Sequence, residues 1–536
     1  MPENDQEAKD LEGQPAHPPE ALTKDEKPDE NSSQAISTEP EYLNGWRLWN
    51  LFLATTAVGF LLMLDSSIVS TAIPHLSSEF HSLLDISWYG ASYQLAKAPS
   101  ACFQPMAGTL YTHLSAKWTF VSFFAIFELG SLLSGVATSS MMLIVARAVE
   151  GLGASGLQNG MFILISGCVP MKKRPALMGL GMGISQAGLV LGPVIGGLLT
   201  QYATWRWCFY INLPIGAAAM IIFLSCNVPE NRPVSTGLSA LIILRQKLDF
   251  VGFVFFAGAA VQLLLALQFG GNQHAWNSAT IISLFCGAGA TIIIFGFVEH
   301  RQGTGAMIPL HLVRQKVVWC SALVMLFSVM TSFCASYYLP IYFQAVMDAS
   351  PSLSGVYLLP LIISQVIIVV LGGSISTIVS IGSGLISTYT PHTSTGKWIG
   401  YQIILGAGRG LGMQMPILTV QGFLPRPQIA IGTAFIMLGH TLGGAISLSI
   451  AQTIFSNSLR TEIRHYAPGV NTQSVISVGA AAIRKVATAE SLPSLLMAYS
   501  VAVNHVFYFT VAAGACSFVF SGGLGWTDIR KTKLAK

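Results

Sequence analysis

Charge is scarce in this sequence, and that scarcity excludes an ordinary soluble protein. Only 10% of the 536 residues are charged and 52% are hydrophobic, whereas soluble domains carry roughly 25% charged residues. Apolar runs of about 20 residues, enough to cross a hydrocarbon core of about 30 Å, recur along the chain. We expect an all-α polytopic membrane protein, because a span in lipid must satisfy its own backbone groups. The predicted spans are 49–73, 86–107, 118–137, 141–164, 177–200, 209–227, 250–268, 280–298, 318–343, 399–423, 429–456 and 501–525.

The sequence also lacks the patterns of an enzyme or a metal site. Its eight cysteines form no Cys-x-x-Cys pair, and its histidines show no zinc-ligand spacing. No nucleophile and base recur at a catalytic spacing, and no phosphate-binding loop is followed by Lys-Ser or Lys-Thr. We therefore expect neither enzymatic activity nor a bound metal, and we interpret the cysteines as small apolar packing residues.

The charges that are present are segregated. Residues 1–44 hold 12 of the 24 acidic residues and only three lysines, which predicts a disordered acidic cytoplasmic tail over 1–45. In the rest of the chain basic residues cluster in alternate loops, at 172–174, 232–247 and 301–316. The positive-inside rule places these loops and the N-terminus in the cytoplasm. Because the excess of positive charge reflects this topology, we expect no nucleic-acid partner.

Ionisable residues inside the spans are candidates for function, because each is costly in hydrocarbon. At a rise of 1.5 Å per residue, Asp65 lies about 24 Å and Arg147 about 20 Å above the cytoplasmic face. The two would pair at this height, with Glu150 one turn deeper on the face of Arg147. Lys97 and Glu128 fall near the midplane, as possible cavity or coupling residues. The alternatives are a lysine that snorkels along a cleft and a glutamate hydrogen-bonded inside the bundle.

Arg409 is surrounded by glycines in Gly-Ala-Gly-Arg-Gly-Leu-Gly-Met-Gln, residues 406–414. Two interpretations stay open. Arg409 and Gln414 line the second half of a cavity, or the arginine holds two helices together.

The segment 188–197, Gly-Leu-Val-Leu-Gly-Pro-Val-Ile-Gly-Gly, predicts a close contact between helices. Three of its glycines recur every four residues and share one helix face, where another helix can approach closely. The proline removes a backbone hydrogen bond and bends the helix. We interpret this face as a seam between helices that move; passive close packing is the alternative. Its packing residues are Gly188, Gly192, Pro193, Gly196 and Gly197.

Together these motifs resemble the major facilitator superfamily, specifically its fourteen-span drug:proton antiporters and most closely the fungal toxin- and drug-efflux branch. The first-span motif Leu-Asp-x-x-Ile-Val-x-x-Ala-Leu-Pro matches residues 64–74, with isoleucine for its last leucine. Arg-x-x-x-Gly-x-Gly matches residues 147–153, and the antiporter motif matches 188–197. Residues 205–214 are similar to a signature of this branch. The resemblance runs from about residue 46 to 526.

The resemblance implies a major facilitator fold. Two helix bundles, 46–228 and 301–526, would be joined by a linker at 229–300 that contains two extra transmembrane helices. A basic cytoplasmic tail at 527–536 would follow. The fold has nominally fourteen spans, in two six-helix bundles related by inverted repeats around a central cavity.

The resemblance also implies an activity. The protein would be a proton-coupled antiporter that exports small amphipathic compounds such as toxins, secondary metabolites or drugs, with Asp65 and Arg147 linked to proton coupling. The proton gradient would supply the energy without a cofactor. We expect a monomer in the plasma membrane, or alternatively in a vacuolar or vesicular membrane, whose partners are the substrate, protons and the bilayer. A facilitator or importer on the same scaffold is one rival.

The loop after the second span departs from the family pattern. The superfamily motif Gly-x-Leu-x-Asp-x-x-Gly-Arg-Lys corresponds to residues 108–117, where Thr112 replaces the gating aspartate. Of the motif's glycines and basic residues, Gly108 and Lys117 are kept. Gating through this loop is therefore weakened relative to the family.

A larger departure lies in residues 353–388, where the family has its tenth and eleventh spans. These roughly 36 uncharged residues are too many for one span and too few for two with a loop. We expect one full helix near 353–373 and a short helix near 375–388 that crosses only partly. A single crossing would invert everything after it. A true deletion, which favours a non-transporting remnant or regulatory protein, and an exon lost from the conceptual translation are the two explanations.

Overall fold

The computed structural model confirms an all-α membrane protein. In the part of the chain that it describes, eleven helices are long and apolar enough to cross a membrane, and no strand is assigned. The acidic tail up to residue 41, Lys97 and the C-terminal tail lie outside the described residues. The described residues are 42–79, 104–230, 248–270, 274–303, 306–308, 310–371, 377–470, 472, 475 and 490–524.

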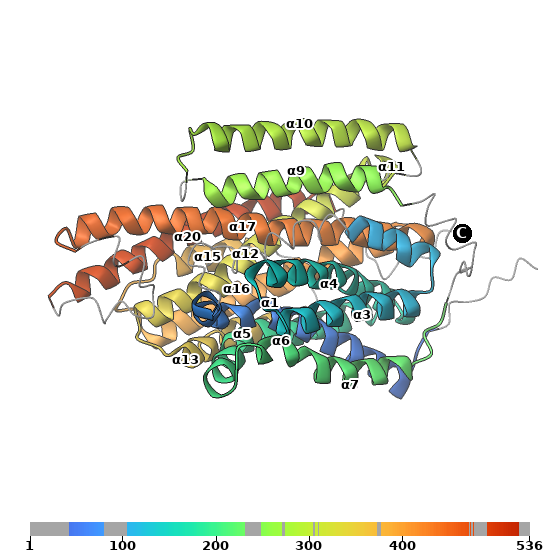
Figure 1. The fold of residues 1–536 in the computed structure, drawn as a ribbon, viewed down its shortest axis with the longest axis horizontal. Coiled ribbons are helices and arrows are strands. Elements are labelled where there is room, and N and C mark those ends of the chain that lie inside the picture. Colours follow the sequence, from blue (N-terminus) through green and yellow to red (C-terminus); the bar gives the residue numbers. More distant parts are fainter. Residues whose placement is uncertain are drawn as a thin grey trace, which may run out of the picture. The chain divides into compact units, whose positions relative to one another are not determined.

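Among the N-terminal helices, α1 packs against α5 and α7, and α3 packs against α4 (Figure 1). Ser115 and Ser139 begin α3 and α4 by accepting hydrogen bonds from Trp118 N and Met142 N. These helices are α1 (Trp46–Glu79), α3 (Ala116–Gly135), α4 (Ser140–Cys168), α5 (Arg174–Tyr202), α6 (Trp207–Tyr210) and α7 (Asn212–Leu224), and residues 104–113 are also helical.

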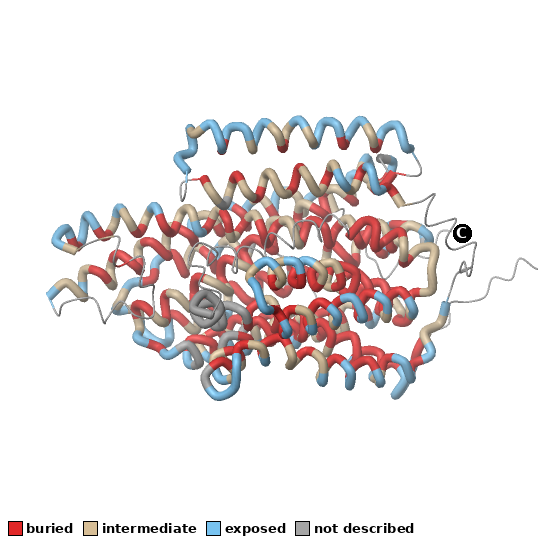
Figure 2. The backbone as a smooth tube through the Cα atoms, viewed as in Figure 1, coloured by how far each residue is buried: buried red, intermediate tan, exposed pale blue. Residues whose placement is uncertain are grey.

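Two further helices, α9 (Phe250–Phe269) and α10 (Ala279–Gln302), form a pair beside the rest of the molecule. The inner member of the pair, α9, contacts α17, whereas α10 packs mainly on α9 and is largely exposed (Figures 1 and 2). Because the exposed side chains of α10 are apolar, this surface is suited to lipid. The pair occupies the position in the chain predicted for the two extra helices.

The C-terminal helices surround α12, which packs against α16, α17 and α20. Pro351 lies in the first turn of α13, where a backbone N–H would have no acceptor within the helix, so the absence of this group in proline costs no hydrogen bond. The elements are α11 (Leu310–Val313), α12 (Lys316–Ala345), α13 (Pro351–Val356), α14 (Leu359–Leu371), α15 (Thr377–Ile386), α16 (Thr395–Phe423), η2 (Arg426–Gln428), α17 (Ile429–Tyr466) and α20 (Leu492–Ser521).

The prediction of one full helix near 353–373 is wrong. The run is divided into α13 and α14 by a turn at Tyr357 and Leu358. Pro360 explains the break, because it lacks the N–H that would bond to the carbonyl of Val356. With 13 residues, α14 is about 20 Å long and shorter than the hydrocarbon core.

The second half of this region is a short helix, as the sequence predicts for 375–388. With 10 residues, α15 is about 15 Å long and cannot cross a bilayer alone.

The direction of α14 follows from its contacts with α16. A Cβ atom on Gly406 would meet the carbonyl oxygen of Leu361, and Gln365 Nε2 lies 3.8 Å from Met413 Sδ. Residue numbers rise together along both helices, so α14 and α16 run parallel.

The direction of α15 is opposite. A Cβ atom on Gly382 would lie 2.6 Å from Leu405 Cα, and one on Gly408 would lie 2.5 Å from Val379 N. Higher residue numbers in α15 therefore lie beside lower residue numbers in α16, so these two helices are antiparallel. Because α15 reverses α14, the chain turns back within this region, and the short α14–α15 pair does not invert the helices that follow.

Contacts between the two halves define a common inner end, at which α1, α3, α12 and α17 begin. A Cβ atom on Gly108 would lie 2.6 Å from Ala434 Cβ, and Gln104 Nε2 donates to Thr441 Oγ1 over 2.9 Å. Helix 104–113 is therefore antiparallel to α17, and α3 begins just beyond its end. The α3–α4 loop and the end of α17 consequently share the opposite, outer side.

Cysteine labelling tests this topology. In a cysteine-free background, Thr138→Cys and Tyr466→Cys should react with a membrane-impermeant maleimide from the same side of the membrane, because both lie at outer ends. Lys172→Cys, in the α4–α5 loop, should react only from the other side. A Tyr466→Cys protein that labels together with Lys172→Cys would show that the chain after α14 is inverted.

Candidate functional site

A buried ion-pair network connects α1 and α4. The Arg147 guanidinium donates through Nη1 to Asp65 Oδ1 at 2.6 Å and to Glu150 Oε2 at 2.8 Å. The three residues are only 2%, 1% and 0% exposed, respectively. Arg147 and Glu150 are one turn apart and share a helix face. The pairing expected from the depth of Asp65 and Arg147 is thus present.

The charges of the network and its surroundings favour the binding of one proton. The Arg147 guanidinium carbon lies 5.5 Å from the centre of the Phe209 ring in α6, and Ser134 Oγ donates to Glu150 Oε2 over 3.5 Å. Glu150 Oε1 is buried without a hydrogen-bond partner among the described residues. Two carboxylates against one guanidinium leave a net negative charge in a buried site, which is costly. Binding a proton to either carboxyl group removes that charge.

The predicted glycine seam lies against the part of α1 that carries Asp65. A Cβ atom on Gly188 would lie 2.5 Å from Phe60 O and 2.9 Å from Leu64 N, and one on Gly192 would meet Ser67 Oγ and lie 2.9 Å from Ile68 N. The absence of side chains on α5 therefore lets the two backbones approach closely.

The remaining residues of the motif differ in their surroundings. Gly196 is buried, and its carbonyl accepts a hydrogen bond from Thr200 Oγ1 at 2.6 Å. A Cβ atom on Gly197 would meet nothing within 4 Å, so this glycine is outside the seam. The α5 helix is continuous through position 193, and the side chain of Pro193 is outside the described set.

Glu128 forms no ion pair with the network among the described residues, but it is close enough to Asp65 for the two carboxyl groups to repel each other. It projects from α3 toward α7, where a Cβ atom on Gly216 would meet its Oε1. Both of its carboxyl oxygens are buried without a hydrogen-bond partner in the described part of the chain. Within the described residues, the alternative of a glutamate hydrogen-bonded inside the bundle therefore has no supporting contact.

The two kept residues of the loop motif are in different places. Gly108 lies at the contact between the halves, against Ala430 and Ala434 of α17. Lys117 Nζ donates to the carbonyl oxygens of Leu224 and Cys226, both at 2.8 Å, and so caps the end of α7. The lysine thus acts within the N-terminal half, and only the glycine meets the other half.

Uncharged polar residues connect the two halves, and the sequence analysis missed all of them except Gln414. Gln158 Nε2 lies 3.2 Å from His440 Nδ1, bridging α4 and α17, in addition to the bond between Gln104 and Thr441. Gln414 of α16, a predicted cavity residue, contacts Met182 Sδ of α5. The available signal was a glutamine inside an apolar span, which is weaker than that of a charge.

Apolar packing also differs between the two ends of the molecule. One continuous cluster of buried side chains joins the inner ends of both halves, with Leu157 and Phe162 from one half and Met325 and Met437 from the other. The outer ends have separate clusters, one in each half. This cluster therefore joins the two halves at the inner end, and α13 and α14 of the C-terminal half also contact α5 of the N-terminal half.

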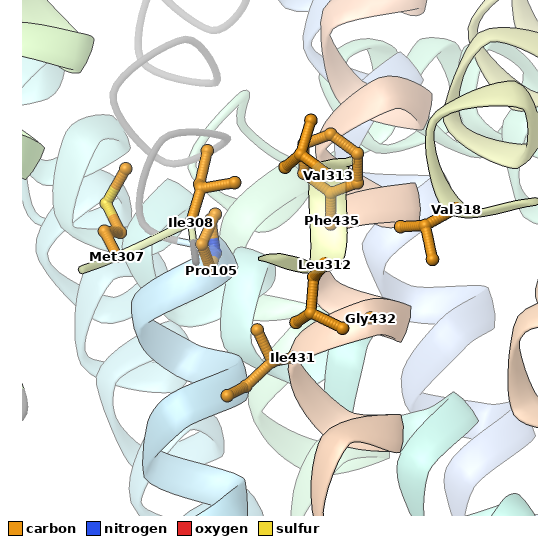
Figure 3. Close-up of a pocket in the computed structure, with 9 residues that line it drawn as sticks. All are labelled: Pro105, Met307, Ile308, Leu312, Val313, Val318, Ile431, Gly432 and Phe435. Atoms are coloured by element: carbon orange, nitrogen blue, oxygen red, sulfur yellow. The ribbon is translucent and has the colours of Figure 1, made fainter. Parts of the chain in front are cut away.

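A small apolar pocket lies beside this inner contact (Figure 3). It includes none of the predicted site residues. The segment after α10 covers it and so touches helix 104–113 and α17 together. The lining residues are Pro105, Met307, Ile308, Leu312, Val313, Val318, Ile431, Gly432 and Phe435.

Arg409 lies in the C-terminal half, apart from the Asp65 network. It is 2% exposed, and its Nε donates to Ser332 Oγ of α12 over 3.0 Å. The arginine thus connects α16 to α12, one of the two interpretations open from the sequence.

Comparison with known proteins identifies relatives along nearly the whole chain. The family model described as Major Facilitator Superfamily matches residues 55–448. An MFS-type transporter of Monascus ruber, pigP, is 52% identical and covers 93% of this chain and 90% of its own length. Efflux pump mlcE of Penicillium citrinum is 46% identical, with 92% and 93% covered. Efflux pump mokI of Monascus pilosus is 44% identical, with 92% and 94% covered.

Solved structures show the same fold at low sequence identity. The human organic anion transporter MFSD10 aligns with a TM-score of 0.53 at 10% identity, over 88% of this chain and 100% of that one. A bacterial homologue of the human lysosomal transporter Spinster aligns with a TM-score of 0.52 at 15% identity, over 91% and 100%.

Proposed function

Because this chain belongs to the Major Facilitator Superfamily and is a membrane-embedded transporter, we propose that it exports small amphipathic compounds in exchange for protons. The observation that carries the proposal is the buried group of Asp65, Arg147 and Glu150, in which two carboxyl groups compete for one guanidinium. The names of the relatives from Penicillium citrinum and Monascus pilosus, both efflux pumps, support export as the direction.

In the proposed cycle a proton binds Asp65 from the outer side. A neutral Asp65 loses most of its attraction to Arg147, which keeps Glu150 as its counterion. Because Asp65 is on α1 and the other two are on α4, protonation weakens the tie between these helices. The α1–α5 seam, where Gly188 and Gly192 carry no side chains, then lets α1 shift against α5.

Exchange requires that the proton and the substrate favour different states. The inner ends of the halves are packed together here, so the proton would favour separation of those ends and substrate entry from the cytoplasm. Substrate binding and release of the proton would then restore inner closure. A coupling of about 1–3 kcal/mol between the two sites, a factor of about 5–150 in affinity, suffices for such a cycle.

We further propose the setting in which this cycle operates. The N-terminus faces the cytoplasm, as the basic loops indicate, and the protein acts as a monomer in the plasma membrane, with a vacuolar or vesicular membrane as the alternative. Glu128 and Lys97 are proposed as additional residues of the proton path or cavity. No cofactor is needed, since the proton gradient supplies the energy.

One observation favours a different function. The helices α14 and α15 are both too short to cross a bilayer, which is the feature expected of a non-transporting remnant or membrane-bound regulatory protein. A facilitator or importer would use the same fold without the proposed coupling.

Efflux from proteoliposomes separates these functions. With a panel of amphipathic dyes, the antiporter should give export that rises about tenfold or more when an inward proton gradient is imposed. A facilitator would equilibrate dye at a rate independent of the gradient. An absence of any protein-dependent flux would contradict the proposal and support the remnant.

A further inference from the structure

The C-terminal half contains a buried positive charge, Arg409, that forms no ion pair with any of the described residues. Arg409 is 14 residues from either end of α16, about 21 Å along the helix from each. Between Glu299 and Glu462 the sequence has a single acidic residue, Asp348. That aspartate is exposed just beyond the outer end of α12 and so lies far from the middle of α16.

One nitrogen of the Arg409 guanidinium is hydrogen-bonded, and another has no acceptor in the described part of the chain. Nε donates to Ser332 Oγ at 3.0 Å, and Nη1 is buried without an acceptor among the described residues. A guanidinium stays protonated in proteins. A buried unpaired charge is strongly unfavourable, and a charge in the middle of a membrane is usually found only where it has a functional partner.

The environment of Arg409 is polar, and no carboxyl group in the described ranges forms an ion pair with it. Ser332 Oγ also donates to the Ser328 carbonyl over 3.1 Å, and Ser328 Oγ lies 3.0 Å from Ser517 Oγ of α20. These hydroxyls can orient a guanidinium and accept or donate hydrogen bonds, but they cannot neutralise its charge. In the N-terminal half, by contrast, Arg147 has two carboxyl partners. No ion pair of Arg409 is found among the described residues, so its charge is left for a ligand to neutralise.

We propose that Arg409 binds a carboxylate group of the exported compound, so that the substrates are amphipathic acids. The assignment rests on the proposed export function and gives it a substrate class. The bond from Nε to Ser332 Oγ holds the guanidinium plane, and Nη1, which has no acceptor among the described residues, is left to donate to the carboxylate. Arg binds carboxylates through two parallel hydrogen bonds, which selects an acid over its neutral ester.

Binding measurements on the purified full-length protein test this assignment without a proton gradient. The probes are pyrenebutyrate, naphthylacetate and phenylbutyrate, each paired with its methyl ester. The wild type should bind at least one acid about tenfold or more tightly than its ester, as expected for a charge-assisted pair. Arg409→Gln should remove this preference and leave ester binding unchanged, and Arg409→Lys should keep part of it.

Lys397→Gln is the matched control, because it removes an exposed positive charge from the same helix. It should leave the preference intact. Equal binding of acid and ester by the wild type in all three pairs would overturn the proposal. An equal loss of acid binding and ester binding in the Arg409→Gln variant would also overturn the proposal.

Thermal unfolding without ligand separates a binding role from a purely structural one. If Arg409 only holds α12 to α16 through Ser332, Arg409→Gln should lower the unfolding midpoint and leave acid binding intact, which contradicts the proposal. If it is a ligand site, the midpoint should stay the same or rise, because an unpaired buried charge is removed, and stabilisation by the acids should disappear. An acid preference with no gradient-driven export would reject the proposed antiport and keep this site.

Discussion

Asp65→Asn should abolish gradient-driven export while leaving the protein in the membrane at its normal level. Asparagine has the shape of aspartate, but its amide group carries no charge and neither binds nor releases a proton at the pH values of a transport assay. Arg147 keeps Glu150, at 2.8 Å, as its counterion, so the variant should lose less than the roughly 3–5 kcal/mol typical when a buried pair is broken. The rate should fall by about tenfold or more, to the level measured without a gradient.

The control for this substitution is Asp348→Asn. It makes the same chemical change at an exposed position with a φ of 58°, a backbone conformation that asparagine also tolerates. Export by this variant should be normal. In the wild type, acidifying the outer side should accelerate export, whereas Asp65→Asn should show a flat response. Undiminished gradient-driven export by Asp65→Asn would refute the role of this carboxyl group in coupling.

Gly192→Leu should block transport with little change in charge. The first atom of the new side chain would already meet Ser67 Oγ and lie 2.9 Å from Ile68 N. The remaining carbons have no space between α1 and α5, so these helices must separate or the protein must lose about 1–3 kcal/mol or more of stability. Either change disturbs the segment of α1 that carries Asp65. Initial export rates, normalised to the amount of protein in the membrane, measure the effect.

Gly197→Leu is the matched control for the seam. It adds the same side chain five residues further along the same helix, where a Cβ atom would meet nothing within 4 Å. This variant should transport at close to the wild-type rate. If Gly192→Leu transports as well as Gly197→Leu, the seam is not a contact that moves during the cycle.

The sequence alone predicts most of the helices, because a lipid-facing span needs a continuous apolar run and allows little ambiguity. The segment 118–137, for example, is found as α3 (Ala116–Gly135). The prediction missed the break between α13 and α14, although Pro360 is visible in the sequence. The spans were predicted from mean hydropathy, which a single proline within an apolar run changes little. The hydrogen bond that Pro360 cannot donate becomes evident only when the helix is built.

The height of Asp65 and Arg147 could also be estimated from the sequence, since helix rise is constant. Their contact could not, because rise gives depth but not the rotation of each helix about its axis. The same limit applies to Glu128, which has a similar charge but faces α7, and to Lys117, which caps α7 and does not reach the other half.

The sequence by itself determined that this protein crosses a membrane many times, that it belongs with the major facilitator transporters, and which few charged residues its spans contain. These properties depend on hydropathy and on short motifs, which are local. Only the tertiary structure decided that Arg147 is shared between Asp65 and Glu150, that Gly188 and Gly192 face α1 while Gly197 does not, and that α15 reverses α14. The tertiary structure also decided that Arg409 forms a hydrogen bond with Ser332. Each of these depends on which faces of distant helices meet, and that is set by packing across the whole molecule.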